Sequence, residues 1–317
     1  MSNHVQSSVD WFSKESLNLK VKLENKKMKK VLIILLILPF ASFSEEVQDT
    51  VKYWKRSGVF SANFSQVSLT NWAAGGQSST SGVFLMNYLA NYKKDSLSWD
   101  NYIDLGYGFL KNNDEALRKS TDKIEFNSKV GYNTGTNWNY AGLVSFKSQF
   151  APGYNYPRAT GDSPISQFLA PAYINVALGM DYKTEFVSLF LSPVTGKFTI
   201  VNDDALSAAG EFGVDPGIKF RSEMGGSARL AFKKEVVKNV TAQSKIDLFS
   251  NYFHNPQNID VDWTFMLNMK VNEWLSANLL TQLIYDNDIK IENSETGHSA
   301  PMVQFMEMFG VGLSFKF

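Results

Sequence analysis

Few side chains in this sequence could perform covalent chemistry. The chain has 317 residues with no cysteine and three histidines, which excludes disulfides, thiolate nucleophiles and thiolate metal sites. An enzyme acting on lipid would need a serine that a histidine activates and a third polar group orients. His4 precedes the export signal described below, and neither His254 nor His298 has a spacing that pairs it with a serine. We therefore expect no catalytic residue and no enzymatic activity.

Carboxylates that could bind a metal ion are also few. Asn202-Asp203-Asp204 could contact calcium, but the segment lacks the ligand spacing of a calcium-binding loop. Glu292 and Glu295 stand in another long connection and have the same limitation. We expect solvated loops at both places, with no metal and no cofactor.

Charged residues of both signs recur at every second position of several apolar segments. Successive side chains of a strand point to opposite faces, so these charges should share one face. In a barrel this face lines the lumen, where charges either line a water-filled path for a small solute or pair and fill the interior. The candidate lumen residues are Asp100, Asp104, Lys123, Glu125, Lys129, Lys147, Arg229, Lys233, Lys245, Asp247, Asp260, Asp262 and Lys270.

Opposite charges on neighbouring segments favour pairing. We expect Glu125 and Lys129 to lie near Lys147. A second group should pair in the same way, namely Lys245 and Asp247 with Asp260, Asp262 and Lys270. A barrel of about eight strands is filled by side chains and one of about sixteen has a channel, so a count near twelve leaves an open and a filled lumen both possible.

Long strands with one apolar face are needed to position these charges. In 259–272 every odd position is apolar and nearly every even position is polar. This length suits a membrane strand of about 9–11 residues better than a soluble strand of ~5–6. Aromatic residues make up 14% of the chain, which suits lipid-facing strands. The alternation predicts strands at 59–68, 80–92, 97–110, 122–134, 138–151, 168–183, 186–195, 224–236, 241–253, 259–272, 274–287 and 302–317, with 80–92 and 186–195 the least regular.

The connections between these segments alternate in length. Short connections are expected at 93–96, 135–137, 184–185, 237–240 and 273. Long ones are expected at 69–79, 111–121, 152–167, 196–223 and 288–301, and the short link at 254–258 is the exception. Short turns on one rim and long loops on the other are typical of outer-membrane barrels. The sequence thus predicts an all-β fold, a transmembrane antiparallel up-and-down barrel of about twelve strands with both termini periplasmic.

Two of the long loops contain residues that could contact a ligand. Trp72 with Gly75 and Gly76 could stack a ligand at the outer rim, or be an interface aromatic followed by a glycine turn. The loop 196–223 either folds inward and constricts the barrel or caps its rim. It carries three apolar residues, Phe212, Val214 and Ile218.

An export signal is expected before the barrel. Four lysines from Lys26 to Lys30 precede the apolar run 31–40, which ends in the small residues Ala41, Ser42 and Ser44. This pattern predicts a cleaved signal peptide at 28–44, and either Met1 or Met28 as the start residue. We expect 1–27 to be an upstream extension, 45–57 a short periplasmic segment and 58–317 the barrel. The alternative, a short membrane anchor, would span only about 15 Å as a helix.

The last predicted strand ends in an alternating apolar row. Phe309, Val311, Leu313 and Phe315 lead to the terminal Phe317. Such a strand resembles the signal that the outer-membrane assembly machinery reads, so we expect this machinery and outer-membrane lipid as partners. Glu307 interrupts the row, which suggests a bulge or a buried polar pair. A formal net charge of zero gives no basic surface for nucleic acid.

Several motifs along the chain carry a family resemblance. They are Asn71-Trp72-Ala73-Ala74-Gly75-Gly76, Lys147-Ser148-Gln149-Phe150 with Gly153-Tyr154, Ser166-Gln167-Phe168-Leu169-Ala170-Pro171, Leu191-Ser192-Pro193-Val194-Thr195, and Gly210-Glu211-Phe212-Gly213-Val214 with Pro216-Gly217. With these motifs, about residues 50–317 resemble an uncharacterised family of bacterial outer-membrane β-barrel proteins, catalogued as domain of unknown function 3078. The resemblance implies an outer-membrane barrel and no assigned activity, and residues 1–27 depart from the family pattern.

These observations favour a barrel that acts as a narrow passage or binding site for a small solute. A structural or adhesion barrel whose long outer loops bind a partner is the alternative. A lipid-active barrel enzyme has no supporting group of residues.

Overall fold

The computed structural model describes residues 53–68, 77–112, 115–156, 161–292 and 299–317. The predicted extension 1–27, the signal peptide 28–44 and residues 45–52 lie outside this part of the chain. So do several residues named above, namely Met1, His4, Met28, Trp72, Gly75, Gly76, Glu295 and His298. Within the described residues, no helix combines the length and apolar character needed to cross a membrane.

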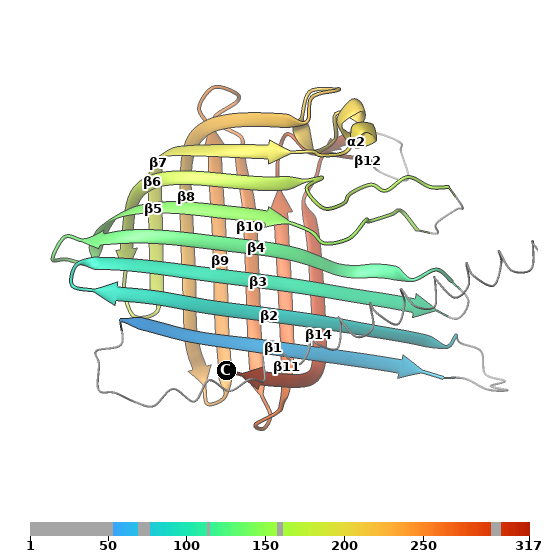
Figure 1. The fold of residues 1–317 in the computed structure, drawn as a ribbon, viewed down its shortest axis with the longest axis horizontal. Helices are drawn as coiled ribbons and strands as arrows, with labels where there is room; N and C mark the ends of the chain where they lie inside the picture. Colours follow the sequence, from blue (N-terminus) through green and yellow to red (C-terminus); the bar gives the residue numbers. More distant parts are fainter. Residues whose placement is uncertain (1–52, 69–76, 113–114, 157–160, 293–298) are drawn as a thin grey trace, which may run out of the picture. The chain divides into compact units, whose positions relative to one another are not determined.

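Twelve long strands close into one antiparallel barrel, in the order β1-β14-β11-β10-β9-β8-β7-β6-β5-β4-β3-β2 (Figure 1). They are β1 (Trp54–Val67), β2 (Ser79–Lys94), β3 (Leu97–Asn112), β4 (Arg118–Asn133), β5 (Trp138–Ser148), β6 (Ala172–Lys183), β7 (Val187–Ile200), β8 (Phe220–Val237), β9 (Val240–Asn251), β10 (Ile259–Lys270), β11 (Leu275–Tyr285) and β14 (Gln304–Lys316). The predicted strand number and fold are confirmed. A small separate sheet of β12 (Lys290–Glu292) and β13 (Ser299–Pro301) was not predicted.

The outer face of the barrel is apolar, as the alternation predicts. Large apolar side chains on this face are exposed, for example Phe305 at 61% and Phe309 at 63%. Exposure of this extent would be costly in water and is typical of a lipid-facing surface. Adjacent strands pair along most of their length, so most backbone polar groups are satisfied inside the sheet, as a lipid environment requires. The β1–β14 seam, paired from Val59 to Ala62, is the exception. The described part of the chain therefore has the construction of a transmembrane barrel.

The less regular alternation in 186–195 has a physical cause. The pairing of β7 with β8 shifts register between Ser192 and Thr195, around Pro193, which cannot donate a backbone hydrogen bond. Beyond this irregularity β7 continues to Ile200, past its predicted end at residue 195. The predicted loop 196–223 therefore shortens to the connection 201–219.

The connections alternate in length between the two rims. Figure 1 shows the turns from β2 to β3 and from β4 to β5 at one end of the barrel, and α2 (Asp204–Ala209) at the other. Two of the tight turns place Asp95 and Asn239 at positive φ, a conformation that Asp and Asn tolerate. Both ends of the barrel chain lie at the short-turn rim, since Tyr53 O accepts a hydrogen bond from Lys93 N and Gly58 exchanges backbone hydrogen bonds with Phe317. The predicted layout of the loops is confirmed.

One local expectation on the last strand is wrong. Glu307 pairs with Thr281 in continuous register, without a bulge, and is exposed on the outer face. It stands close to the loop-side end of β14, which begins at Gln304. A carboxylate at this end of a strand can remain hydrated where the apolar belt meets water, so it needs no buried partner.

Candidate functional site

The lumen contains a cavity of about 520 Å³. Its volume falls within the range of roughly 300–1,000 Å³ that is typical of small-ligand sites. Inward-facing residues of most of the twelve strands line it, together with Phe212 from the connection between β7 and β8. Predicted lumen residues that line the cavity are Asp104, Lys123, Glu125, Lys147, Arg229, Asp247, Asp260 and Asp262. The site is therefore assembled by barrel closure, because its residues come from segments far apart in the sequence.

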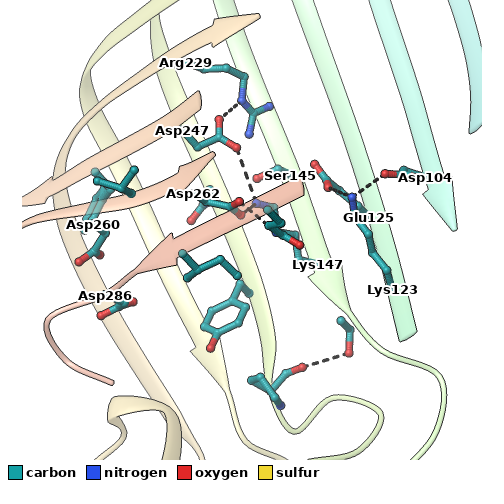
Figure 2. A pocket seen from close by; sticks show the side chains of 18 of the residues that line it. Asp104, Lys123, Glu125, Ser145, Lys147, Arg229, Asp247, Asp260, Asp262 and Asp286 are labelled. Carbon is teal, nitrogen blue, oxygen red and sulfur yellow. Dashed lines mark hydrogen bonds and ion pairs between the residues drawn. The ribbon is translucent and has the colours of Figure 1, made fainter. Parts of the chain in front are cut away.

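Ion pairs cross the middle of the lumen. Glu125 on β4 pairs with Lys245 on β9, and Lys147 on β5 pairs with Asp262 on β10 at 2.5 Å. These strands stand on opposite sides of the ring, so each pair spans the interior. Figure 2 shows Lys147 between Asp247 and Asp262, and the Lys123 ammonium beside Asp104. We call this group the central network; it consists of Asp104, Lys123, Glu125, Lys147, Arg229, Lys245, Asp247 and Asp262.

The central network compensates two like charges that the strand register brings together. Asp247 on β9 is directly opposite Asp262 on β10. Lys147 Nζ reaches both carboxylates, at 2.5 Å from Asp262 Oδ2 and 3.6 Å from Asp247 Oδ2. Arg229, opposite Asp247 on β8, donates a hydrogen bond to it and a second one of 2.7 Å to Asn127. Buried charges are stable only when they are paired in this way, so the network fixes the strands around it.

A second group of charges lies nearer the loop-side rim. Lys197 on β7 contacts three carboxylates, those of Asp260 at 2.6 Å, Asp286 at 3.0 Å and Glu223 at 3.8 Å. Arg221 pairs with Glu223 and Asp288 at 3.0 and 2.6 Å. We call these residues the upper network; it consists of Lys197, Arg221, Glu223, Asp260, Asp286 and Asp288. Four carboxylates surround two cations, so its formal charge favours a positively charged group.

A third group closes the lumen toward the short-turn rim. Lys129 on β4 pairs with Asp181 on β6 at 2.7 Å and donates a hydrogen bond of 2.9 Å to Ser188. Lys183 pairs with Asp100 across β3 to β6 at 2.5 Å. The barrel interior is thus crossed by paired charges at three levels, and the cavity extends beside the central and upper networks.

Two polar side chains in the cavity have no protein partner. Ser145 on β5 is 1% exposed, and its hydroxyl makes no hydrogen bond to any described residue. The same holds for Oδ1 of Asn175, which is directly opposite Ser145 on β6. Both residues line the cavity. A buried polar atom without a partner is costly, so these two groups are available to a bound solute or to water.

The opposite wall of the cavity is apolar. Leu85 on β2, Leu280 and Ile284 on β11 and Met306 on β14 line it. Next to Met306 along the inner face, Met308 contacts the Thr121 hydroxyl of β4 at 3.8 Å. The cavity therefore offers hydrogen-bonding groups on β5 and β6 and hydrocarbon surface on β2, β11 and β14.

The connection 201–219 both caps the rim and reaches inward. Val214 is buried in a cluster with Ala170, Val201 and Leu206, and Phe212 packs against this cluster and lines the cavity. Phe212 therefore reaches inward and Val214 belongs to the part of the loop that caps the rim, so each of the two alternatives describes part of the loop. Ile218 is 52% exposed.

Asp203 and Asp204, which could have contacted calcium, make hydrogen bonds and an ion pair within and around this loop. Asp203 is the N-cap of α2 and accepts a hydrogen bond from Leu206 N at 2.9 Å. Its second oxygen accepts one from Gln167 at 2.6 Å. Asp204 pairs with Lys219 at 2.6 Å, and this hydrogen bond and the lysine charge lower the pKa of the Asp204 carboxyl.

The predicted neighbours of the lumen charges are found in part. Glu125 is directly opposite Lys147 and Asp247 is directly opposite Asp262, as expected, but several ion pairs differ from the expected ones. Lys147 pairs with Asp262 and Asp247, whereas Lys129 pairs with Asp181. The expectation considered neighbouring strands only, whereas the pairs Glu125–Lys245 and Lys147–Asp262 form across the lumen. Lys270 and Lys233 lie near the short-turn ends of their strands, are exposed, and have no ion pair among the described residues. Solvent replaces a partner there, because the strand ends are hydrated.

Several site residues were not predicted. Asn127 and Ser145 stand in the same alternating rows as Glu125 and Lys147, but only charged residues were selected from those rows. Lys197 and Glu223 fell in a segment that was assigned to a loop. His254 is exposed in the connection between β9 and β10. No group of three or more metal-ligating residues occurs in the described ranges.

Comparisons with known proteins give one family match. The profile of the family described as protein of unknown function (DUF3078) matches residues 64–154, which confirms the predicted resemblance over that stretch. The motifs at 166–171, 191–195 and 210–217 lie beyond it. No curated protein matches the sequence significantly.

Three solved outer-membrane proteins match this chain at low sequence identity. The COG4313 outer membrane channel from Pseudomonas putida has 13% identity and a TM-score of 0.38, over 86% of this chain and 100% of that one. The translocator domain of the autotransporter NalP from Neisseria meningitidis has 10% identity and a TM-score of 0.35, over 96% and 98%. OmpT of Vibrio cholerae, an outer membrane protein, has 8% identity and a TM-score of 0.29, over 83% and 97%. These scores are too low to support an inference about this chain.

Proposed function

We propose that this chain is an integral barrel of a bacterial outer membrane that binds a small solute in its lumen and catalyses no reaction. The exposed apolar outer face and the closed pairing of the strands support the membrane location. Both ends of the barrel chain lie at the short-turn rim, which in outer-membrane barrels faces the periplasm. The apolar C-terminal strand ending at Phe317 is the proposed contact for the assembly machinery.

The observation that carries this proposal is the cavity beside the unpartnered Ser145 and Asn175. A solute with a hydrogen-bonding group would supply the partner that these side chains lack. The upper network adds a surplus of negative charge on the loop side of the cavity. The site therefore suits a small polar solute, and more readily a cationic than an anionic one.

Passage through the barrel requires the central network to separate. The pairs Glu125–Lys245 and Lys147–Asp262 bridge the lumen, so an unaltered barrel should be a narrow and poorly conducting path. We infer that the solute binds above these pairs and that passage is limited by their separation.

Conductance in a planar bilayer tests this proposal. The double variant K147A/D262A removes one cation and one anion together, so that Asp247 keeps Arg229 and Lys245. We expect its single-channel conductance in potassium chloride to exceed that of the unaltered barrel severalfold. The matched control K270A removes an inward lysine that has no ion pair among the described residues, and should conduct like the unaltered barrel. A folded double variant that does not conduct would contradict the proposed passage.

Filling the cavity tests solute binding separately. S145L places an apolar side chain beside Asn175 and should slow the swelling of vesicles in glycine or ethanolamine at least severalfold relative to V144L. Val144 is the neighbouring outward residue, 43% exposed, so V144L controls for the added volume. Equal swelling rates in both variants would argue against a solute site at Ser145.

A further inference from the structure

The seam that closes the barrel is incomplete. β1 and β14 pair over four residues, from Val59 opposite Lys316 to Ala62 opposite Leu313. Gly58 and Phe317 extend the seam by one backbone pair, with hydrogen bonds of 2.7 and 3.0 Å. Every other adjacent pair of barrel strands is matched over ten or more residues. The pairing thus stops at Ala62, although β1 continues to Val67 and β14 begins as early as Gln304.

Small side chains and one unsatisfied group occupy the point where the pairing stops. A Cβ atom built on Gly310 would lie 3.7 Å from the Cβ of Asn63, and one on Gly312 would lie 2.8 Å from the Cα of Asn63. The strands therefore still touch at Asn63, without a ladder beyond it. Asn63 Oδ1 is buried and has no hydrogen-bond partner among the described residues. From Phe64 to Val67 the loop-side edge of β1 has no paired residue on β14.

The cavity wall behind this interruption is the apolar one. Met306 lies on β14 itself, while Leu85 on β2 and Leu280 on β11 lie on the strands that flank β1 and β14. On the outer side, Phe64 and Phe309 are exposed at 64% and 63% to the lipid-facing surface. Hydrocarbon surface therefore occurs on both sides of the place where strand pairing ends.

We propose that the unpaired part of the β1–β14 seam is a lateral entrance, through which a single-chain amphiphile moves between the membrane and the lumen cavity. The hydrocarbon chain would contact Met306, Leu85 and Leu280, and the polar end would reach the hydrogen-bonding groups of Ser145 and Asn175 on the far wall. This inference rests on the proposed solute site and adds its substrate class and its route.

The energetics favour this route over the rim for such a molecule. Opening the loop-side part of the seam breaks no β1–β14 ladder bond, because the ladder ends at Ala62. A hydrocarbon chain that slides from lipid to the apolar wall also avoids exposure to water, which would cost about 0.8 kcal/mol per methylene group. Entry at the rim would instead take the chain past the charges of the upper network.

A disulfide across the interruption tests the entrance. The chain has no cysteine, so N63C/G310C introduces the only pair, with Cβ atoms near the separation of about 3.5–4.5 Å that a disulfide needs. S61C/S314C is the matched control, since these residues already face each other in the paired part of the seam. The barrels are placed in phosphatidylcholine vesicles that contain a lysophosphatidylcholine with a diazirine at its chain end, or that receive diazirine-labelled dodecylamine from the water. After illumination, mass spectrometry locates the labelled residues.

Labelling of the inward Leu85 and Met306 reports entry, and labelling of the outward Phe305 and Phe309 reports lipid contact. We expect inward labelling in the unaltered barrel and in S61C/S314C, a loss of at least fivefold in oxidised N63C/G310C, and recovery on reduction. If the N63C/G310C disulfide reduces labelling by the lysophosphatidylcholine, the amphiphile comes from the bilayer. If it reduces labelling by dodecylamine alone, the source is a free amphiphile, and either result supports the entrance. No inward labelling, or labelling that the lock leaves unchanged, would overturn it. Conductance and swelling of the same preparations show separately whether the proposed solute site has failed.

Discussion

Replacing Lys147 by methionine should destabilise the barrel by an amount that its carboxylate partners determine. Lys147 is the cation between Asp247 and Asp262, which the register of β9 and β10 places opposite each other. Methionine keeps most of the side-chain volume and removes the charge. Asp262 then keeps only the hydrogen bond of 3.1 Å from Gln282 as a side-chain contact among the described residues.

The magnitude follows from the burial of the pair. Removing one partner of a buried ion pair costs about 3–5 kcal/mol, because the other charge remains buried and unpaired. The Lys147 and Asp262 side chains retain 24% and 20% of their exposure, so partial solvation reduces this to about 2–3 kcal/mol. The double variant K147M/D262N removes both charges, and should lie within about 1 kcal/mol of the unaltered barrel. The coupling between the two positions is thus expected to be at least about 1–2 kcal/mol, even if D262N alone costs nothing.

Urea-induced unfolding of the barrel in lipid vesicles, followed by tryptophan fluorescence, measures these free energies. The four proteins of the cycle are the unaltered barrel, K147M, D262N and K147M/D262N, with K270M as a control for the loss of an inward lysine. If the loss of stability in K147M/D262N equals the sum of the losses in K147M and D262N, the two residues are not coupled. The ion pair across the lumen would then not be what holds β5 to β10, and the reasoning would be refuted.

Three further outcomes are expected. The unaltered barrel and K147A/D262A should prefer potassium over chloride in reversal-potential measurements under a salt gradient. D260N/D286N should weaken this preference at least twofold, because it removes two carboxylates beside Lys197. An unchanged reversal potential would contradict the role of the upper network. F212A should raise conductance, since Phe212 lines the cavity from the loop, and an equal rise in the exposed-loop control I218A would show that the loop rather than this ring is responsible. D203A should cost about 1 kcal/mol of local stability, because it removes the N-cap of α2. Faster proteolysis within 201–219 would show this loss. D204A should have a smaller effect, because the ion pair of Asp204 with Lys219 is exposed.

The alternation of side chains was sufficient to predict most of the barrel. In β10 the odd positions face outward and the even ones inward over the whole strand, because one face meets lipid and the other the lumen. β1 was harder to delimit. Gly58 stands in the outward-facing row of β1, and the ring of Phe317 occupies the space that a side chain would need there. The apolar row that would have revealed the start of the strand at Trp54 is therefore interrupted.

The partners of the lumen charges could not be read from the sequence. Alternation gives the face on which Lys147 lies, but its contact with Asp262 depends on the number of strands and on their stagger around the ring. The same limit applies to Glu125 and Lys245, which are 120 positions apart. The unpartnered Ser145 and Asn175 were visible only as polar residues in the alternating rows, and their lack of partners is a property of the closed barrel.

The contact between Gly58 and Phe317 also constrains how the barrel can form. The ring of the last residue covers the glycine near the beginning of the first strand and stacks on Tyr88 at 6.3 Å between ring centroids. The seam therefore cannot be completed until both Gly58 and Phe317 have been synthesised. Contacts of such large sequence separation are slow to form, because the entropy of ordering the intervening chain is lost before they can stabilise it. A chain that has been synthesised only as far as β11 therefore lacks the strand that closes the ring on β1.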